Sequence, residues 1–219
     1  MKKLALTLLS ALLLCGCLSG IFKRDAITVN YYQIDYPSIA KTCEKPFDLA
    51  LSFRKLQVNS AYDRSTLIYM NGDKSGGVYS YDEWLSSPDE LIFSMLQRDL
   101  EDAGVFKSLT TRTSGTLPDY GLNGTLVEVY ESRELLSVQA KAHVVMLFTL
   151  TRLDRGSRTS RVVLQKRYTA DTECVSGDPE SYVQGVCASL RDISERLNKD
   201  VYAAVGEEEA RIKGEEVKK

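Results

Sequence analysis

Residues 137–153 alternate apolar and polar side chains over a stretch longer than most strands of globular proteins. Successive side chains of a strand point to opposite faces of a sheet, so this alternation predicts one long strand with one buried face. The predicted buried positions are Val138, Ala140, Ala142, Val144, Met146, Phe148 and Leu150, and the polar positions are Gln139, Lys141, His143, Thr149 and Thr151. With the β-prone segments 120–131 and 161–171 on either side, it predicts an antiparallel meander.

The first of two predicted helices spans residues 88–103. Ser87 is placed to cap its N-terminus, and Pro88 suits the first helical position. Glu90, three residues after Ser87, completes a capping box, and Gly104 supplies a left-handed stop.

The second predicted helix spans residues 179–205 and opens with Asp178 as N-cap and Pro179 as first residue. Its apolar residues recur at spacings of three and four, which is typical of a helix that packs one face on a sheet. Gly206 is expected to end this helix, and the charged residues 207–219 are expected to form a flexible tail.

Shorter β segments complete the predicted fold. Residues 29–36 and 47–53 have strand patterns, and segments 67–70 and 78–81 flank a glycine-rich turn, which predicts a hairpin. We therefore predict an α+β fold: an antiparallel β-sheet with the two main helices packed on one face.

The N-terminus has the layout of a secretory signal peptide. A basic start precedes an apolar run, residues 4–14, which is too short to span a bilayer as a helix. The sequence Leu-Cys-Gly-Cys at 14–17 then resembles the bacterial lipobox, with Cys15 in place of the usual Ala or Ser. We expect residues 1–16 to be a lipoprotein signal peptide and Cys17 to carry acyl chains such as palmitate. The alternative is an ordinary secreted protein with a chance cysteine.

Lipidation of Cys17 predicts where the mature chain resides. Two or more acyl chains suffice for stable anchoring in a membrane. The next residue is Leu18 rather than the Asp that retains lipoproteins at the inner membrane of enteric bacteria, so we expect the outer membrane, with the protein in the periplasm. Residues 17–28 form the expected tether and residues 29–206 a single domain.

Charge and cysteine content narrow the partners further. Cleavage removes two of the 28 basic residues, which leaves 26 against 30 acidic ones, a net charge of about −4 without the basic patch that nucleic-acid binding requires. Three cysteines remain in an oxidising compartment, so at most one disulfide can form. If one forms, we expect Cys43 with Cys174, because Cys187 lies on the apolar stripe of the second helix.

The sequence carries no motif for catalysis, metal binding or a cofactor. HExxH, paired CxxC, GxSxG and a phosphate-binding loop that leads into a helix are all missing. The one histidine, His143, lies on the predicted polar face, with no Ser, Cys or carboxylate constellation near it in sequence. We predict a non-enzymatic protein without a cofactor; the alternative is an envelope hydrolase whose site is assembled from distant residues.

Several segments share their residues and their order with a known family. They read Tyr-Tyr-Gln-Ile-Asp at 31–35, Tyr-Asp-Arg-Ser-Thr-Leu-Ile-Tyr at 62–69, Tyr-Ser-Tyr-Asp-Glu-Trp at 79–84, Ser-Pro-Asp-Glu-Leu at 87–91, Asp-Ala-Gly-Val-Phe at 102–106 and Asp-Tyr-Gly-Leu-Asn-Gly-Thr-Leu at 119–126. In this the chain resembles the ABC-type transport auxiliary lipoproteins that include PqiC. The resemblance implies a non-catalytic component of an MCE/ABC-type envelope lipid transport system, which docks the periplasmic MCE-domain protein at the outer membrane.

Aromatic residues crowd the predicted hairpin and its exit, where Trp84 follows three tyrosines. They either fill the groove between hairpin and first helix or form an exposed binding surface, because aromatic enrichment is also typical of interfaces. We expect Trp84 in the core and take as candidate partner-binding residues Tyr69, Gly76, Gly77, Tyr79 and Tyr81. Self-association into a homo-oligomer stays open. The main alternative function is a structural or regulatory lipoprotein that binds a peptidoglycan synthase.

Replacement of the predicted acceptor cysteine tests the anchor. Cys17→Ala should leave an unprocessed precursor at the inner membrane, because no thiol is available for the diacylglycerol. Cys15→Ala, which restores the usual lipobox residue, should be processed normally. Labelled palmitate incorporation and membrane fractionation measure both outcomes, and normal maturation of Cys17→Ala at the outer membrane would contradict the lipobox interpretation.

Overall fold

The computed structural model describes residues 27–72, 75–110, 117–153 and 160–217. The chain divides into two units, residues 1–30 and 31–219, and the fold described below is that of the second unit. Its described part forms an α+β fold with one mixed sheet and two helices. In the described residues, no helix is both long and apolar enough to span a membrane.

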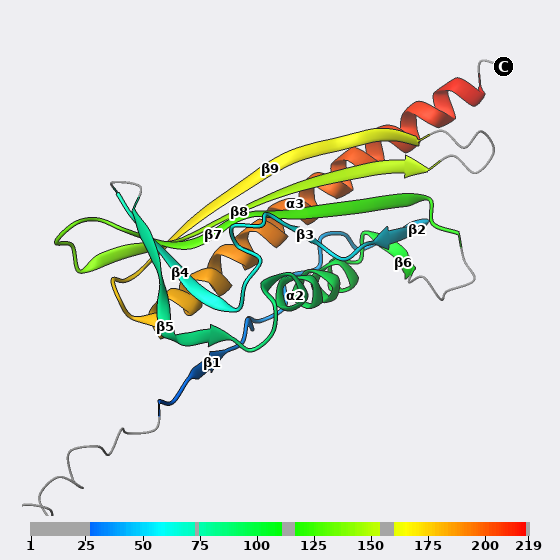
Figure 1. The fold of residues 1–219 in the computed structure, drawn as a ribbon. Helices are drawn as coiled ribbons and strands as arrows, with labels where there is room; N and C mark the ends of the chain where they lie inside the picture. Colours follow the sequence, from blue (N-terminus) through cyan, green and yellow to red (C-terminus); the bar gives the residue numbers. More distant parts are fainter. Residues whose placement is uncertain (1–26, 73–74, 111–116, 154–159, 218–219) are drawn as a thin grey trace, which may run out of the picture. The chain divides into compact units, whose positions relative to one another are not determined.

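A meander of three long strands forms the main part of the sheet (Figure 1). β7 (Tyr120–Arg133) pairs antiparallel with β8 (Gln139–Leu153), and β8 pairs antiparallel with β9 (Ser160–Val175). The predicted strands and their antiparallel order are confirmed here. The inward positions of β8 from Ala140 to Leu150 are buried, as the alternation predicts.

The other edge of β7 is shared by three short strands that follow one another in the chain. They are β2 (Phe47–Phe53), β3 (Gln57–Val58) and β4 (Thr66–Asn71), and all three run parallel to β7. The predicted antiparallel order therefore holds for the meander, whereas this half of the sheet is parallel. Side-chain alternation indicates which face of a strand is buried, but it carries no information on the direction of the neighbouring strand.

Further strands extend the sheet at its two ends. β5 (Gly76–Trp84) forms the predicted hairpin with β4 and pairs also with β1 (Asn30–Tyr32), whereas β6 (Phe106–Thr110) pairs parallel with β2. β1 is shorter than predicted. After Tyr32 the chain leaves the sheet, although it still contributes buried side chains at Ile34, Tyr36 and Ile39.

Helix α2 (Pro88–Ala103) has the predicted bounds, and Gly104 ends it in the left-handed conformation at φ 64°. The predicted capping box is not formed, because the Ser87 side chain makes no capping hydrogen bond and Glu90 instead accepts one from Ser86 at 2.7 Å. Helix α3 (Pro179–Glu216) starts as predicted. The Asp178 side chain accepts hydrogen bonds from the backbone N–H groups of two residues in its first turn.

Helix α3 does not end at Gly206 but continues to Glu216, so the expected tail from 207 is wrong over most of its length. A contact with the sheet holds this part of the helix, because Glu209 accepts a hydrogen bond from the Tyr120 hydroxyl at 2.8 Å. Within the helix, the buried Glu208 pairs with Arg211 at 2.7 Å. A glycine inside a helix costs only about 1 kcal/mol, which such contacts offset.

The core lies between the sheet and the helices. α3 packs against β8 and β9 and contacts α2. The largest side chains without solvent exposure come from β7, β9 and α3, and Trp84 is buried, as predicted. Val138 is the exception among the predicted inward positions, because it lies before the first paired residue of β8, in the β7–β8 turn, and is 80% exposed.

The predicted disulfide is not formed, because Cys43, Cys174 and Cys187 are all free thiols. The Cys43 thiol donates to the backbone oxygen of Gly104 at 3.1 Å, near the end of the sheet where β7 begins, whereas Cys174 pairs with Ala140 at the other end of the ladder. The two cysteines are thus separated by about a strand of 13 residues, on the order of 40 Å. Burial raises the pKa of Cys174 to about 11, so this thiol stays protonated.

The packing of α3 can be tested at Leu190, which is fully buried. Leu190→Ala should lower the free energy of unfolding by about 2 to 5 kcal/mol, because it leaves a cavity between helix and sheet. Lys199→Ala, at an exposed position of the same helix, should change it by less than about 0.5 kcal/mol. Urea denaturation measures the free energy of unfolding of both variants. Equal changes for Leu190→Ala and Lys199→Ala would contradict the packing of α3 on the sheet.

Candidate partner-binding surface

The β4–β5 hairpin is joined to β7 through a buried carboxylate. Glu131 on β7 is fully buried, and it accepts hydrogen bonds from the Tyr79 hydroxyl, from the backbone N–H of Gly177 at 2.9 Å and from Arg133, with which it pairs at 2.7 Å. A buried carboxylate requires partners of this kind. Burial and the adjacent Glu131 raise the pKa of Tyr79, so its hydroxyl stays protonated and donates.

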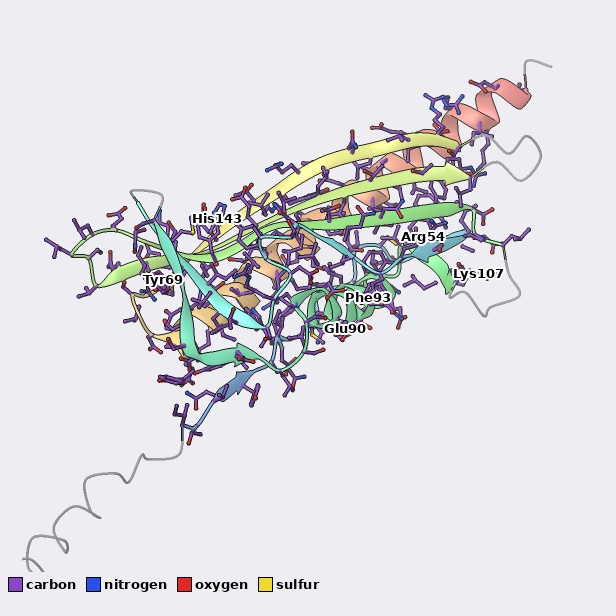
Figure 2. All side chains as sticks on the ribbon, viewed as in Figure 1. Arg54, Tyr69, Glu90, Phe93, Lys107 and His143 are labelled. Carbon is purple, nitrogen blue, oxygen red and sulfur yellow. The ribbon has the colours of Figure 1, made fainter. Side chains whose placement is uncertain are left out.

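The Arg133 side chain lies against two tyrosines of the hairpin, Tyr69 and Tyr79. We call Glu131, Arg133, Tyr69 and Tyr79 the Glu131 cluster. The guanidinium carbon of Arg133 is 3.8 Å from the ring centroid of Tyr69 and 5.0 Å from that of Tyr79. The two rings meet edge to face with their centroids 5.7 Å apart. These cation–π and aromatic contacts add to the ion pair with Glu131 and fix the hairpin on β7. Figure 2 labels Tyr69 on this hairpin.

Four of the five predicted partner-binding residues are thus part of the hairpin's own packing. Tyr69 and Tyr79 belong to the Glu131 cluster. A Cβ atom on Gly76 would lie 2.4 Å from the Met70 sulfur, and one on Gly77 would lie 2.5 Å from the Tyr69 hydroxyl oxygen, so both glycines let β5 approach the β4 side chains. Replacement of Tyr79, a candidate partner-binding residue, would therefore also remove contacts that hold the hairpin.

The fifth residue, Tyr81, has a different environment. It is 49% exposed, and Val78 on the same strand and Leu85 just after it are also exposed. Apolar side chains that remain accessible on a well-anchored hairpin suit a contact with another protein. Tyr81 is therefore the predicted residue that is best placed to meet a partner.

His143 contacts two carboxylates that sequence reasoning did not connect with it. Its Nδ1 is 2.6 Å from Asp171 on β9 and its Nε2 is 3.3 Å from Glu128 on β7. Its ring lies 4.8 Å from that of Tyr130, which stacks on Tyr62. Both ring nitrogens are therefore occupied, and neither is oriented toward a nucleophile as in a catalytic triad. Figure 2 shows His143 on β8.

The described residues offer no group of three or more His, Cys, Asp or Glu side chains that could hold a metal ion. A groove of about 600 Å³ lies between residues 33–37 and α3, lined by Cys187, Arg191 and Glu195 among others. The sequence did not indicate this groove, because residues 33–36 were predicted to continue the strand that begins at residue 29. The segment is held in place by Tyr36, whose hydroxyl donates to the buried Asp99 at 2.9 Å.

The sequence at 119–126, which carries part of the resemblance, has a structural role at three of its positions, Asp119, Tyr120 and Gly124. Asp119 accepts a hydrogen bond from the Ala50 N–H at 2.9 Å, and thereby joins β2 to the start of β7. Tyr120 is buried and reaches α3 through its hydroxyl. A Cβ on Gly124 would lie 2.5 Å from the end of the Leu56 side chain and 2.7 Å from the Phe148 ring, so any other residue there requires these buried side chains to shift. This segment therefore defines the junction of β2, β3, β7 and α3.

Comparison with known proteins adds to this structure. No family model matches the chain. No curated protein matches it either. Among solved structures, a DUF330 protein of Xanthomonas campestris is similar with a TM-score of 0.71 and 14% identity, over 84% of this chain and 99% of that one. An uncharacterized protein is similar with a TM-score of 0.59 and 12% identity, over 80% of this chain and 99% of that one. The fold is thus of the same type as in these two proteins.

The different roles of the hairpin tyrosines can be separated by removal of single hydroxyl groups. Tyr79→Phe should lower the free energy of unfolding by about 1 to 3 kcal/mol, because buried Glu131 loses a donor. Tyr81→Phe, at the exposed position of the same strand, should change it by less than about 0.5 kcal/mol. Thermal or urea unfolding measures both, and a neutral Tyr79→Phe would contradict the anchoring role of the cluster.

Proposed function

We propose that this chain is an outer-membrane lipoprotein that acts as a non-catalytic auxiliary component of an MCE/ABC-type envelope lipid transport system. In this proposal, acyl chains on Cys17 hold it at the outer membrane, and its domain docks the periplasmic MCE-domain protein there. The transported lipid does not react on the protein, so the role requires binding surfaces and no active site.

The observation that carries the proposal is the agreement between the sequence resemblance and the fold. The family-like segment 119–126 forms the junction of strands and helix in a fold that is similar to a DUF330 protein, and DUF330 corresponds to the PqiC-like family. The likeness to that protein, at 14% identity, concerns the fold alone. The family function comes from the sequence resemblance.

The geometry of His143 supports a non-catalytic role over the hydrolase alternative. A general base must have a ring nitrogen free to take a proton from a nucleophile or a water. Both nitrogens of His143 face carboxylates, Asp171 and Glu128. The histidine therefore joins three strands, β7, β8 and β9, through their outer faces.

The exposed part of the β4–β5 hairpin is the docking surface in this proposal. The Glu131 cluster holds the hairpin rigidly on β7, so little conformational freedom is lost when a partner binds. Tyr81 presents an aromatic ring that a partner can desolvate, and such residues often dominate the binding energy of an interface.

Tyr81→Ala tests this docking surface. It should weaken the pull-down of the MCE-domain protein from the same organism by about thirtyfold in affinity, which corresponds to about 2 kcal/mol for one lost anchor, with the melting temperature unchanged. Tyr202→Ala is the matched control, because Tyr202 is a 40% exposed tyrosine on α3. Binding and thermal unfolding are measured on the same preparations.

Three results would count against the proposal. Unchanged binding of Tyr81→Ala would place the docking surface elsewhere. Equal losses of affinity for Tyr81→Ala and Tyr202→Ala would show that the hairpin has no specific role in binding. Reproducible capture of a peptidoglycan synthase in place of an MCE-domain protein would favour the alternative function.

A further inference from the structure

The turn between β7 and β8 exposes a group of aliphatic side chains. Leu135 is 90% exposed, Leu136 is 98% exposed and Val138 is 80% exposed. We call these three residues the leucine tip. A surface aliphatic residue by itself is ordinary, but three within four positions at the end of a hairpin form a contiguous apolar projection, which marks a contact with another phase or molecule.

The backbone of Leu136 is in the left-handed region, with φ at 65°. L side chains disfavour this region, and the other positive φ values among the described residues belong to Gly104 and Gly177. Glycine would satisfy the turn with less strain. The geometry of the turn therefore does not account for a leucine at 136, and the side chain itself must have a use outside the fold.

The leucine tip is held in place by hydrogen bonds, so its exposure is part of the structure. Inside the turn, the Ser137 N–H donates to the Glu134 oxygen at 3.2 Å, and the Gln139 N–H donates to the Ser137 hydroxyl oxygen at 3.0 Å. The Ser176 N–H donates to the Val138 oxygen at 2.9 Å, which ties the turn to the β9–α3 connection. Figure 1 shows the turn at the end of the sheet where α3 begins.

Polar residues directly behind the leucine tip form a collar. They line a depression of about 160 Å³ together with Ala140, and they are Ser132, Glu134, Ser137, Gln139, Lys141 and Glu173. An apolar end followed by a polar collar matches the depth profile of a membrane surface, where acyl chains lie below the headgroups.

We propose that the leucine tip inserts Leu135 and Leu136 into the surface of a lipid bilayer. This rests on the proposed function, because the membrane comes within reach through the acyl chains on Cys17. The expected tether of residues 17–28 spans at most about 40 Å, so the domain stays near the bilayer and insertion of the tip becomes an intramolecular event.

Two features favour a lipid surface over a protein as the occupant. The tip is convex and offers three apolar side chains, whereas a stable protein interface takes roughly 20 to 30 residues from each side. The collar carries two carboxylates, Glu134 and Glu173, and one ammonium group, Lys141, and this net charge of −1 is too small to steer a charged partner strongly. Insertion into a bilayer needs neither a large complementary area nor charge complementarity.

Fluorescence quenching by brominated lipids tests the insertion. The mature lipoprotein, purified from cells and reconstituted into phosphatidylcholine vesicles with bromine on the upper acyl chain, carries Leu136→Trp. Trp84, the one natural tryptophan, is 3% exposed, and the wild-type protein gives its background. We expect the added fluorescence of Leu136→Trp to fall at least twofold relative to bromine-free vesicles.

Val162→Trp is the matched control. Val162 is also an exposed aliphatic residue of the meander, at 56%, but it pairs with Thr151, eleven residues along β8 from Ala140. This places Val162 about 35 Å from the leucine tip along the ladder, so the fluorescence of Val162→Trp should be the same in brominated and bromine-free vesicles.

Adding Leu135→Asn to Leu136→Trp should reduce the quenching by half or more. Leu136→Gly should not lower the melting temperature, which shows that the tip is dispensable for folding.

The outcomes separate this inference from the proposed function. Leu136→Trp without quenching, in a protein that stays with the vesicles, overturns the inference and leaves the lipoprotein proposal intact. A protein that does not carry acyl chains and does not stay with vesicles overturns the lipoprotein proposal. Equal quenching of Leu136→Trp and Val162→Trp also overturns the inference. So does a shift in the emission spectrum of Leu136→Trp that occurs only after an MCE-domain protein is added, because that result shows that the leucine tip binds a protein.

Discussion

The pairing of β7 on both of its edges is the constraint on which the rest of the structure depends. One edge forms a long antiparallel ladder with β8, from Tyr120 opposite Arg152 to Arg133 opposite Ala140. The other edge is shared by β2, β3 and β4, each parallel to β7. Parallel pairs need long crossover connections, and here the chain provides them by a path through β5, α2 and β6 before it returns as β7. A single strand thus organises both halves of the sheet.

The two ends of β7 have different roles, and at each end buried polar groups determine which elements are joined. At the start of β7, Asp119 and Tyr120 connect β2 and the late part of α3, which makes this end a structural junction. At the other end, the Glu131 cluster fixes the β4–β5 hairpin, and the leucine tip follows directly. Tyr81, Leu135 and Leu136 are thus exposed at the end of β7 where hydrogen bonds and ion pairs hold the backbone in place. Rigid support of this kind lowers the entropic cost of binding.

The tyrosines of the β4–β5 hairpin have different environments, which the sequence alone did not distinguish. Aromatic crowding led to the choice of the β4–β5 hairpin as candidate site, but it did not separate Tyr69 and Tyr79, which stabilise the hairpin, from Tyr81, which is exposed. That distinction depends on Glu131 and Arg133, which lie more than 50 residues along the chain from Tyr79. The leucine tip was not predicted as a site either, because Val138 fits the alternation of β8 and was assigned to the buried face. The ladder ends one residue after it, which only pairing could show.

The sequence by itself determined the elements whose signals are local. These are the meander with its buried face, the bounds of α2 with its left-handed Gly104, the N-terminal start of α3 at Asp178, and the hairpin with its glycine-rich turn. The tertiary structure decided what depends on distant partners: the parallel direction of β2, β3 and β4, the continuation of α3 past Gly206, the separation of Cys43 from Cys174, and the exposure of Leu135 and Leu136. The physical reason is that propensity, capping and periodicity act within a few residues, whereas strand direction and burial are set by groups that only folding brings together.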